Sequence, residues 1–489
     1  MSPLAWAAHV APFATAVPAA TPDPAQLLPA RQMMAFTLGF HIVLVPFGVA
    51  FTFLMLIANY RGIRRADQDA LVLARRWSQV AAVLFAVGAV SGTVLSFEMG
   101  LLWPGLMSRF GAAYGFPFAI EGLFFFLEAI FVAVYIYGWD RLAPWPHFWT
   151  GVPVVLAGVG GTASVVAANS WMNQPGGITL RDGVVVDVRP LQVFFNRAFW
   201  YETIHMLLAA YMVAGFIVAG VYAAGRLKGR RDRRHRLGLL VPFTVAAIAT
   251  PIQIFVGDVA ARAVFENEPA KFASIEALAT TGTHVPESLG GVMVDGRLRY
   301  AVEIPSGASL LSGFRPSTRI RGLDAIPPQY RPADHLVTTV HLAFDVMVGI
   351  GFALLALSAW FAWSWWRRRD VPDNRWLLRA VSVSGALALI ALWSGWVVTE
   401  VGRQPWTVVG LLLTRDAVTR SGNMWLFFGG TLVLYAAVGA ATLFTLRLMR
   451  RRWERGDASD DRTEAGDADV PYGPSRARDA VPPTGAGSR

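Results

Sequence analysis

A glutamate closes an apolar run late in the chain, and its neighbours are of types that hold charged groups of a cofactor. Glu400 follows the apolar residues 380–398 and precedes a turn with the sequence Gly402-Arg-Gln-Pro-Trp406. A carboxylate removed from water needs a partner nearby, because an unpaired buried charge is costly. Trp396 lies one turn earlier on the same helical face, and Arg403 is within reach of an anionic group. This stretch predicts one wall of a cofactor pocket at a membrane surface.

Further glutamates lie in other apolar stretches. Glu121 and Glu128 are seven residues apart, nearly two helical turns, so their carboxyls share one face of a helix. Glu98 lies near the end of the preceding apolar stretch, and Asn169 near the end of the following one. A single buried glutamate is compatible with a protonated packing residue. Several of them together favour a proton relay or carboxylate ligation over a structural role.

Two histidines and a methionine in apolar stretches are candidate ligands of heme iron. His41 and His205 each lie early in a long apolar run, and a neutral imidazole binds iron without importing charge. Taken singly, each is better explained by a hydrogen bond to a neighbouring helix. Met347 is of a type that usually packs in a helix, but its depth allows it to face His205, and His/Met is a standard low-spin heme pair. His341 on the same helix is a rival ligand, and spacing leaves both open.

Lys271 and Glu276 lie just after an apolar run, in a long polar connection. As a pair in an exposed loop they would ordinarily be a solvated surface. Their position beside a membrane surface, where a lipid-soluble substrate arrives, leaves a binding role equally open.

The composition indicates a polytopic membrane protein. The chain has 489 residues, of which 54% are hydrophobic and 16% charged, with a mean hydropathy of +0.44. The absence of cysteine excludes disulfides, thiolate-bound iron–sulfur clusters and thioether-linked heme, so any metal must be held by His, Met or carboxylate. The net charge of +10 would suggest nucleic acid as a partner of a soluble protein, but here the basic residues gather in the connections between apolar runs.

Nine apolar segments are each long enough to cross a bilayer core of about 30 Å, so we predict an all-α protein with nine transmembrane helices. The basic clusters all fall on one side if the spans alternate from an outside N-terminus, which places the C-terminus in the cytoplasm. The predicted spans are 33–57, 78–97, 116–137, 150–170, 199–224, 239–256, 337–363, 377–398 and 423–446. The basic clusters lie at 61–65 with 75–76, and at 226–236, 367–369 and 447–452.

The spans divide the chain into five parts. Residues 1–30 are Ala/Pro-rich and predict a flexible leader, and 448–489 predict a disordered cytoplasmic tail. Helices 1–6 occupy 31–256 and helices 7–9 occupy 337–447. The connection 257–336, on the outer face, is long enough to be functional or disordered, and it hints at short strands near 292–302.

Taken together, the motifs resemble those of subunit I of the cytochrome bd-type quinol oxidases, in the branch with a short quinol loop often called cyanide-insensitive oxidases. The resemblance runs from about His41 to the ninth span. The motifs that carry it are Gly402-Arg-Gln-Pro-Trp406 after Trp396 and Glu400, Ile120-Glu-Gly122 with Leu127-Glu128, Gly138-Trp-Asp-Arg-Leu142, Asn169-Ser-Trp-Met172, and Lys271 with Glu276.

The resemblance implies a quinol:oxygen oxidoreductase of the bacterial inner membrane. It implies a low-spin heme b, a high-spin heme b and either heme d or a further heme b. It also implies membrane quinol (ubiquinol or menaquinol) and O2 as substrates, cytoplasmic protons, and a membrane potential generated without pumping. Its partners would be subunit II, a possible small accessory subunit and the lipid bilayer.

The same resemblance implies roles for individual residues. His205 and Met347 would ligate the low-spin heme, and His41 and Glu400 would each belong to the high-spin pair. The remaining assignments are Trp396 packed between hemes, Arg403 near propionates, Glu121 and Glu128 in oxygen-site ligation and proton delivery with Glu98 close by, and Lys271 with Glu276 in quinol binding. One departure is Asp345, where many members carry a basic residue two positions before the heme methionine.

Two other classes of membrane protein remain alternatives. A secondary transporter would use the buried carboxylates to bind ions, but the sequence has no inverted repeat and no sign of interrupted helices. A heme b electron carrier would lack oxygen chemistry. Redox spectra distinguish these classes from an oxidase.

Overall fold

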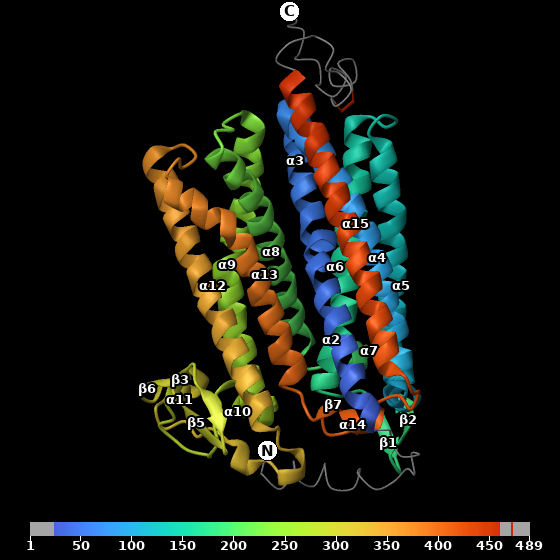
Figure 1. Ribbon diagram of the computed structural model, residues 1–489, viewed down its shortest axis with the longest axis vertical. Coiled ribbons are helices and arrows are strands. Elements are labelled where there is room, and N and C mark those ends of the chain that lie inside the picture. The colour runs from blue at the N-terminus through green and yellow to red at the C-terminus, as the bar shows by residue number, and fades with distance from the viewer. Residues whose placement is uncertain (1–23, 460–470, 473–489) are drawn as a thin grey trace, which may run out of the picture.

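The computed structural model describes residues 24–459 together with 471 and 472. In this part of the chain nine helices are long and apolar enough to cross a membrane, and they run up and down alternately (Figure 1), which confirms the predicted all-α polytopic class. The first crossing comprises α2 (Pro24–Pro46), η1 (Phe47–Phe51) and α3 (Thr52–Arg65). The others are α4 (Gln68–Leu102), α5 (Pro104–Gly138), α6 (Pro144–Asn173), α8 (Phe199–Leu227), α9 (Arg233–Asn267), α12 (Asp334–Arg368), α13 (Arg375–Val401) and α15 (Met424–Ser459).

The helices extend beyond the predicted spans, and three expected boundaries are wrong in the described part. Residues 24–30, expected in the leader, form the start of α2, and 448–459, expected in the disordered tail, continue α15. The outer connection begins after Asn267 rather than at 257, because α9 continues for about three more turns. Hydropathy marks only the apolar centre of a helix, whereas hydrogen bonding carries the helix past the bilayer. The remaining residues of the leader and tail lie outside the described residues.

Proline and capping residues explain where several helices begin. Pro104 and Pro144 stand in the first turn of α5 and α6, where a missing N–H costs nothing. Asn374 caps α13 by accepting from the backbone N–H groups of Trp376 and Leu377 at 2.8 and 3.3 Å. These local signals lie in the sequence and set the start of each crossing.

The first crossing is interrupted by a π-helical turn, which the sequence analysis did not anticipate. η1 directly follows Pro46, whose ring cannot continue the hydrogen-bond ladder. A Cβ at Gly158 of α6 would lie 3.2 Å from the carbonyl oxygen of Gly48, so α6 approaches the backbone closely at this turn. The hydroxyl of Thr52 donates to the same carbonyl at 2.8 Å, which satisfies it.

The helices pack in two neighbouring groups. α8, α9, α12 and α13 share one apolar core, and α2, α4, α5 and α6 lie beside them (Figure 1). A Cβ at Gly385 of α13 would lie 2.5 Å from Cα of Ile217, so the backbones of α13 and α8 touch at this crossing. α13 is therefore held against α8, and Glu400 at its end is hydrogen-bonded to Asn169 of α6 in the neighbouring group.

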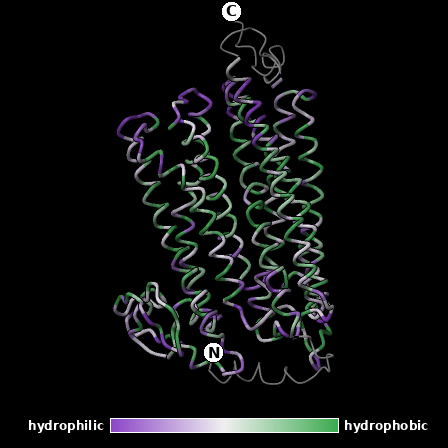
Figure 2. Tube along the Cα trace, in the orientation of Figure 1, coloured by the Kyte–Doolittle hydropathy of each residue, from purple (hydrophilic) through white to green (hydrophobic). Residues whose placement is uncertain are grey.

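Hydrophilic residues gather at the end of the bundle where α3, α8, α12 and α15 terminate (Figure 2). The four basic clusters of the sequence all lie at this end, as the alternation of nine spans predicts. At the opposite end lie the long connection between α9 and α12 and the short hairpins.

The long outer connection is a small folded unit. It contains α10 (Pro269–Ile275), α11 (Gly307–Gly313), two 3-10 turns, η2 (Leu323–Ala325) and η3 (Pro328–Tyr330), and two nested hairpins. β3 (Glu287–Leu289) pairs with β6 (Val302–Ile304), and β4 (Val292–Val294) pairs with β5 (Arg297–Arg299). The β4–β5 turn is Asp295-Gly296 with both φ values positive, the preferred chemistry of a two-residue hairpin. The strands expected near 292–302 are thus confirmed.

Three other short elements and one hairpin were missed. β1 (Ile178–Arg181) and β2 (Val184–Val188) form a hairpin whose turn is again Asp-Gly, at 182–183, so the signal was present in the sequence. α7 (Pro190–Phe194), the strand pair β7 (Trp406–Val408) with β8 (Leu412–Leu413), and α14 (Thr414–Ala417) also lie at this end. They close the outer end of the α2–α6 group.

Asp67 joins the first two crossings at the basic end, and we expect it to contribute to stability. Its buried carboxylate accepts from the backbone N–H of Ala70 and pairs with Arg61 at 3.2 Å and Arg233 at 2.8 Å. Burial alone would raise the pKa of Asp67, but the hydrogen bond and charge of Arg233, the Ala70 N–H and Arg61 outweigh it and lower this pKa below its usual range.

Asp67→Ala should lower the free energy of unfolding by about 1–3 kcal/mol at neutral pH, from loss of a helix cap and two partly exposed ion pairs. Because the folded-state pKa is depressed, this contribution is present above the unfolded-state value and is lost as the pH falls through the folded-state value. Thermal unfolding in detergent should therefore show a difference from wild type that disappears in acid. Asp187→Ala, in an exposed pair, is the control; equal losses in both variants at neutral pH would contradict the expectation.

Candidate functional site

A cavity of about 490 Å³ lies among α2, α4, α5 and α6, and the end of α13 closes one side of it. Its volume is within the range of about 300–1,000 Å³ usual for small-molecule and cofactor sites. Six of the predicted site residues line it: His41, Glu121, Glu128, Trp396, Glu400 and Arg403. Glu121 and Glu128 both face this space, as their seven-residue spacing predicts, and Oε1 of Glu128 is buried without a hydrogen-bond partner among the described residues.

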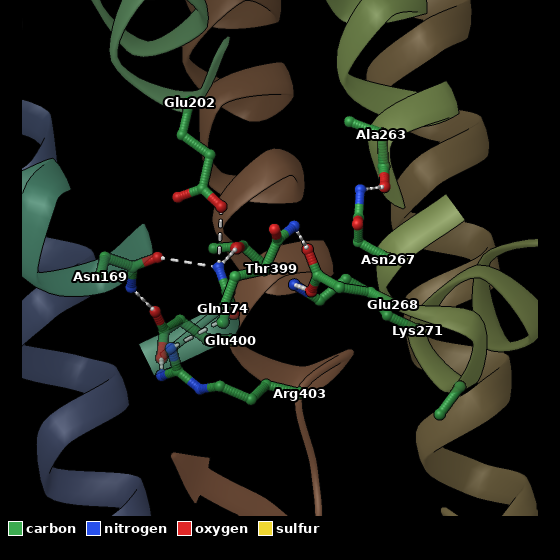
Figure 3. Close-up of polar contacts among 12 residues, drawn as sticks. Asn169, Gln174, Glu202, Ala263, Asn267, Glu268, Lys271, Thr399, Glu400 and Arg403 are labelled. Carbon is green, nitrogen blue, oxygen red and sulfur yellow. Dashed lines mark hydrogen bonds and ion pairs between the residues drawn. The ribbon is translucent and has the colours of Figure 1, made fainter. Parts of the chain in front are cut away.

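Glu400 is the centre of a polar network at the mouth of this cavity (Figure 3). Its Oε2 accepts from Arg403 at 2.5 Å, and its Oε1 accepts from the amide of Asn169. The amide of Asn173 donates to Oε1 of Glu202 at 2.9 Å and lies 3.4 Å from Oδ1 of Asn169. The partner expected for Glu400 is thus Arg403 itself. Arg403 is 6% exposed and its Nε makes no hydrogen bond in the described part of the chain, so one donor remains for a further anionic group.

Lys271 lies beside this network rather than in an exposed loop. It is 5% exposed and pairs with Glu268 one turn earlier, and the amide of Gln174 donates to the same carboxylate at 3.2 Å (Figure 3). A Cβ at Gly402 would lie 2.9 Å from Cγ of Lys271, so the turn after Glu400 packs directly on the lysine side chain. The expectation of a solvated Lys/Glu surface is therefore wrong for Lys271.

His41 has one nitrogen free for a ligand. The hydroxyl of Ser91 donates to the carbonyl of Gly88 at 3.1 Å, so it accepts from Nδ1–H of His41 at 2.9 Å. This assigns the proton to Nδ1 and leaves the lone pair of Nε2 available in the cavity. A Cβ at Gly92 would lie 3.1 Å from Cε1 of His41, so the glycine leaves room for the ring.

His205 and Met347 lie in the other helix group. Nδ1 of His205 is buried without a hydrogen-bond partner in the described structure, which is unusual for a polar group. Gly257 of α9 leaves space beside this ring, since a Cβ there would lie 3.3 Å from Cε1. Met347 points toward Gly395 of α13, where a Cβ would lie 3.1 Å from Sδ. Both side chains thus abut glycines on neighbouring helices.

The hydrogen bonds of His341 argue against it as a ligand of heme iron. Its Nδ1 lies 2.7 Å from the carbonyl oxygen of Ile275 and its Nε2 lies 2.8 Å from that of Gly290. Both nitrogens are occupied by the outer connection, and the ring is 1% exposed. Of the two candidates on α12, only Met347 has a side chain free to bind iron.

Glu98 is not among the residues that line the cavity, although Met99 beside it is. It is buried near the end of α4, where its Oε2 accepts from the hydroxyl of Thr37 at 2.5 Å, and its Oε1 has no partner in the described structure. Glu276 ends α10 and contacts Glu287 of β3 rather than Lys271. The structure thus separates Lys271 and Glu276 into two environments of the same loop.

Two carboxylates in this region were missed by sequence reasoning. Glu202 lies one turn before His205, and Glu268 lies one turn before Lys271. An acid three residues from a candidate ligand or a candidate binding lysine on the same helix is a signal available in the sequence. What the sequence lacks is the partner of each, Asn173 and Gln174, which come from the end of α6.

Comparison with known proteins decides among the remaining alternatives. Residues 29–454 match the family model described as cytochrome bd terminal oxidase subunit I. The chain belongs to this family. A candidate cytochrome bd menaquinol oxidase subunit I of Bacillus subtilis (strain 168) is 33% identical over 86% of this chain and 95% of its own length. The cytochrome bd ubiquinol oxidase subunit 1 of the same organism is 27% identical over 89% and 95%.

The solved structure of the bd oxidase from Geobacillus thermodenitrificans is also similar to this chain. It aligns with a TM-score of 0.81 and 32% sequence identity, over 87% of this chain and 98% of the other. As a member of the cytochrome bd family, the chain is part of a quinol:oxygen oxidoreductase of respiratory electron transport that uses heme, and a multi-pass protein of the bacterial inner membrane. Family membership therefore excludes both a secondary transporter and an electron carrier without oxygen chemistry. The π-helical interruption of the first crossing does not change this conclusion.

Proposed function

We propose that this subunit holds three hemes in two places. His205 and Met347 would hold the iron of a low-spin heme b within the α8, α9, α12 and α13 group. The cavity lined by His41 and Glu400 would hold a high-spin pair, a heme b together with heme d or a further heme b. The observation that carries this proposal is the free lone pair of His41 Nε2 in a cavity that also presents Glu400 and Arg403.

The residues of the cavity fit a heme, whose iron supplies the electron transfer and oxygen chemistry once bound. Imidazole and carboxylate are iron ligands, and Trp396 supplies a flat apolar wall. The unpaired Nε of Arg403 suits a propionate, because a guanidinium binds carboxylates through paired donors. Arg403 thereby holds both Glu400 and the anionic edge of a cofactor in place.

Quinol oxidation is assigned to the outer connection, through Lys271 and Glu276. A buried lysine held by Glu268 presents a donor to a quinol oxygen, and a carboxylate accepts a quinol proton as electrons leave. The contact between Lys271 and Gly402 supports this placement, since it joins the loop to the turn beside the high-spin cavity.

Protons for oxygen reduction are proposed to reach the cavity through Glu128 and Glu121, with Glu98 in a secondary position. The N-terminus then lies outside and the basic end faces the cytoplasm, as the positive-inside rule favours. If quinol protons leave outside while oxygen's protons come from inside, each electron transfers one charge equivalent, worth about 2.3 kcal/mol per 100 mV. The membrane potential is built without a pump.

The remaining parts of the proposal concern partners. The quinol is ubiquinol or menaquinol, and the subunit assembles with a subunit II and a possible small accessory subunit. Large apolar side chains of α12 and α15 are exposed in the isolated chain, among them Phe352, Trp363, Leu426 and Val433, and they require lipid or protein to cover them.

The reduced-minus-oxidised absorption spectrum of the purified oxidase, with and without carbon monoxide, tests the heme assignment. Pyridine hemochrome analysis gives the heme types alongside. A far-red band that shifts with carbon monoxide is expected for heme d at an open site, and high-spin heme b without that band for the b-only form. A low-spin spectrum without any carbon monoxide response would contradict the high-spin cavity.

Gly92→Ala should disturb the high-spin site specifically. Its methyl group would press on the His41 ring, whose Cε1 lies only 3.1 Å away. A misplacement of about 1 Å at a reacting centre costs roughly 100-fold in rate. The His41 ring needs to shift by less than this, so we expect turnover to fall by about two- to tenfold and the carbon monoxide spectrum to change. Gly100→Ala, on the same helix with open space around it, is the control. An identical spectrum in both variants would argue against His41 as a ligand.

A further inference from the structure

The outer connection carries a second carboxyl beside Glu276 that neither the family resemblance nor the sequence motifs assign. Glu276 ends α10, and Glu287 begins β3, eleven positions later in the chain. The two carboxyl groups are hydrogen-bonded to each other. A hydrogen bond between two carboxyls requires a proton, so this arrangement is that of a pair that has taken up one of the two protons it can hold.

His341 of α12 brings the two carboxyls together. Its nitrogens contact the carbonyl of Ile275, the residue before Glu276, and that of Gly290, three residues after Glu287. The buried ring thus lies within hydrogen-bonding distance of the backbone on either side of the pair and connects both segments to α12.

Asp345 completes this arrangement one turn further along α12. Its Oδ2 accepts from the backbone N–H of Gly290 at 2.6 Å and lies 3.7 Å from Nε2 of His341. The sequence showed an acid here where many family members carry a base. In the structure the nearest basic side chain on this helix is His341, four residues earlier, whose Nε2 faces the Asp345 carboxylate.

The surroundings of the pair favour its holding a proton. The charged groups that the structure places against it are Asp345 and His341, and α11, which contacts Glu287 through Gly307, contains no ionisable residue. Burial raises the pKa of Glu276 well above its usual range, and the Glu287 charge, the hydrogen bond to Glu287 and the Asp345 charge raise it further. Burial first, and then Asp345, also raises the pKa of Glu287.

We propose that Glu287 is a second proton acceptor of the quinol site, so that Glu276 and Glu287 together take up the two protons of one quinol. This inference rests on the proposed role of the outer connection in quinol oxidation. Oxidation of one quinol to quinone releases two electrons, which enter the enzyme toward oxygen, and two protons. The first proton becomes the one shared by the ionised pair, and the second neutralises the remaining carboxylate. Both protons then leave to the outer water before the next quinol binds.

The pH dependence of kcat/KM for quinol tests this proposal. The ionised pair is the accepting form, so activity is lost as the pH falls through the raised pKa values of the pair. In the wild-type holoenzyme this loss should begin well above the ordinary glutamate value of about 4.3, and its limiting slope should approach two. A slope of one in wild type would overturn the proposal, whichever variants assemble.

Glu287→Gln removes the neighbouring charge and the shared hydrogen bond. The onset of the loss should move to lower pH by about one unit or more, and its slope should fall to one. At the optimum, kcat/KM should fall by roughly tenfold, less than the 100-fold or more that loss of a sole general base costs. Glu303→Gln, on exposed β6 of the same hairpin, is the matched control and should keep the wild-type profile. A Glu287→Gln profile equal to that of the control would overturn the proposal.

Glu276→Gln separates this inference from the proposed function. If Glu276→Gln leaves quinol oxidation unchanged, the outer connection is not the quinol site and both fail. If Glu276→Gln impairs quinol oxidation and Glu287→Gln does not, the quinol site stands and the second acceptor is refuted. Dithionite-reduced heme spectra of each variant show that the cofactors are retained.

Discussion

Replacing His205 with leucine should abolish quinol-supported oxygen consumption and remove the low-spin heme signal from the reduced spectrum. Nδ1 of His205 is buried and has no partner among the described residues, so no hydrogen bond at this nitrogen explains its burial. Removing an outer-shell partner of a metal ligand typically costs about 10- to 100-fold in activity. The loss of turnover here should be larger than about 100-fold, because the proposed ligand itself is deleted. Leucine fills similar space without a ligand atom. Heme content and stopped-flow reduction by quinol measure the effect.

His335→Leu is the matched control for this variant. His335 lies in the first turn of α12 and is exposed, so the same change of residue type there should leave the spectrum and the turnover as in wild type. A His205→Leu protein that keeps a normal low-spin spectrum would show that His205 is a structural histidine and not a heme ligand.

Glu128→Gln should slow oxygen reduction while quinol still reduces the low-spin heme. A positioned proton donor contributes about 10²- to 10⁴-fold, so we expect turnover to fall on the order of 100-fold. Glutamine has nearly the same shape and cannot pass on a proton. The unpartnered Oε1 of Glu128 in the cavity is the observation behind this expectation. Single-turnover kinetics with quinol and then with oxygen separate the two half-reactions.

Glu266→Gln provides the comparison, since it makes the same chemical change at an exposed site at the outer end of α9. Glu128→Asp should retain a measurable part of the activity, because a carboxyl remains at the position. Unchanged oxygen reduction in Glu128→Gln would remove this residue from the proton path.

The two carboxylates of α5 and the pair in the outer connection do different work in this scheme. Glu121 and Glu128 would bring protons to the cavity, whereas Glu276 and Glu287 would take protons from quinol. Hydrogen bonds join Glu202, through Asn173 and Asn169, to Glu400. Charge separation then follows from the placement of acceptors on opposite sides rather than from a moving part.

Local physics made much of this protein predictable from its sequence. Hydropathy over about twenty residues identifies a crossing without reference to the rest of the chain, so the nine spans and the shared end of their basic clusters followed directly. The seven-residue spacing of Glu121 and Glu128 determined that both face one side of α5. The Asp-Gly turns at 182–183 and 295–296 also carried the local chemistry of a hairpin, although neither turn was used and strands were expected only near the second.

Only the tertiary structure decided which partner each polar residue takes. Glu276 meets Glu287, Lys271 meets Glu268, and His341 is occupied by two carbonyls of a loop that begins some seventy residues before it. Sequence spacing left His341 and Met347 equal as ligands because both lie on one helix at neighbouring depths. The choice depends on how a folded loop satisfies its buried carbonyls, and hydrogen bonds between segments distant in sequence leave no periodic trace in either segment.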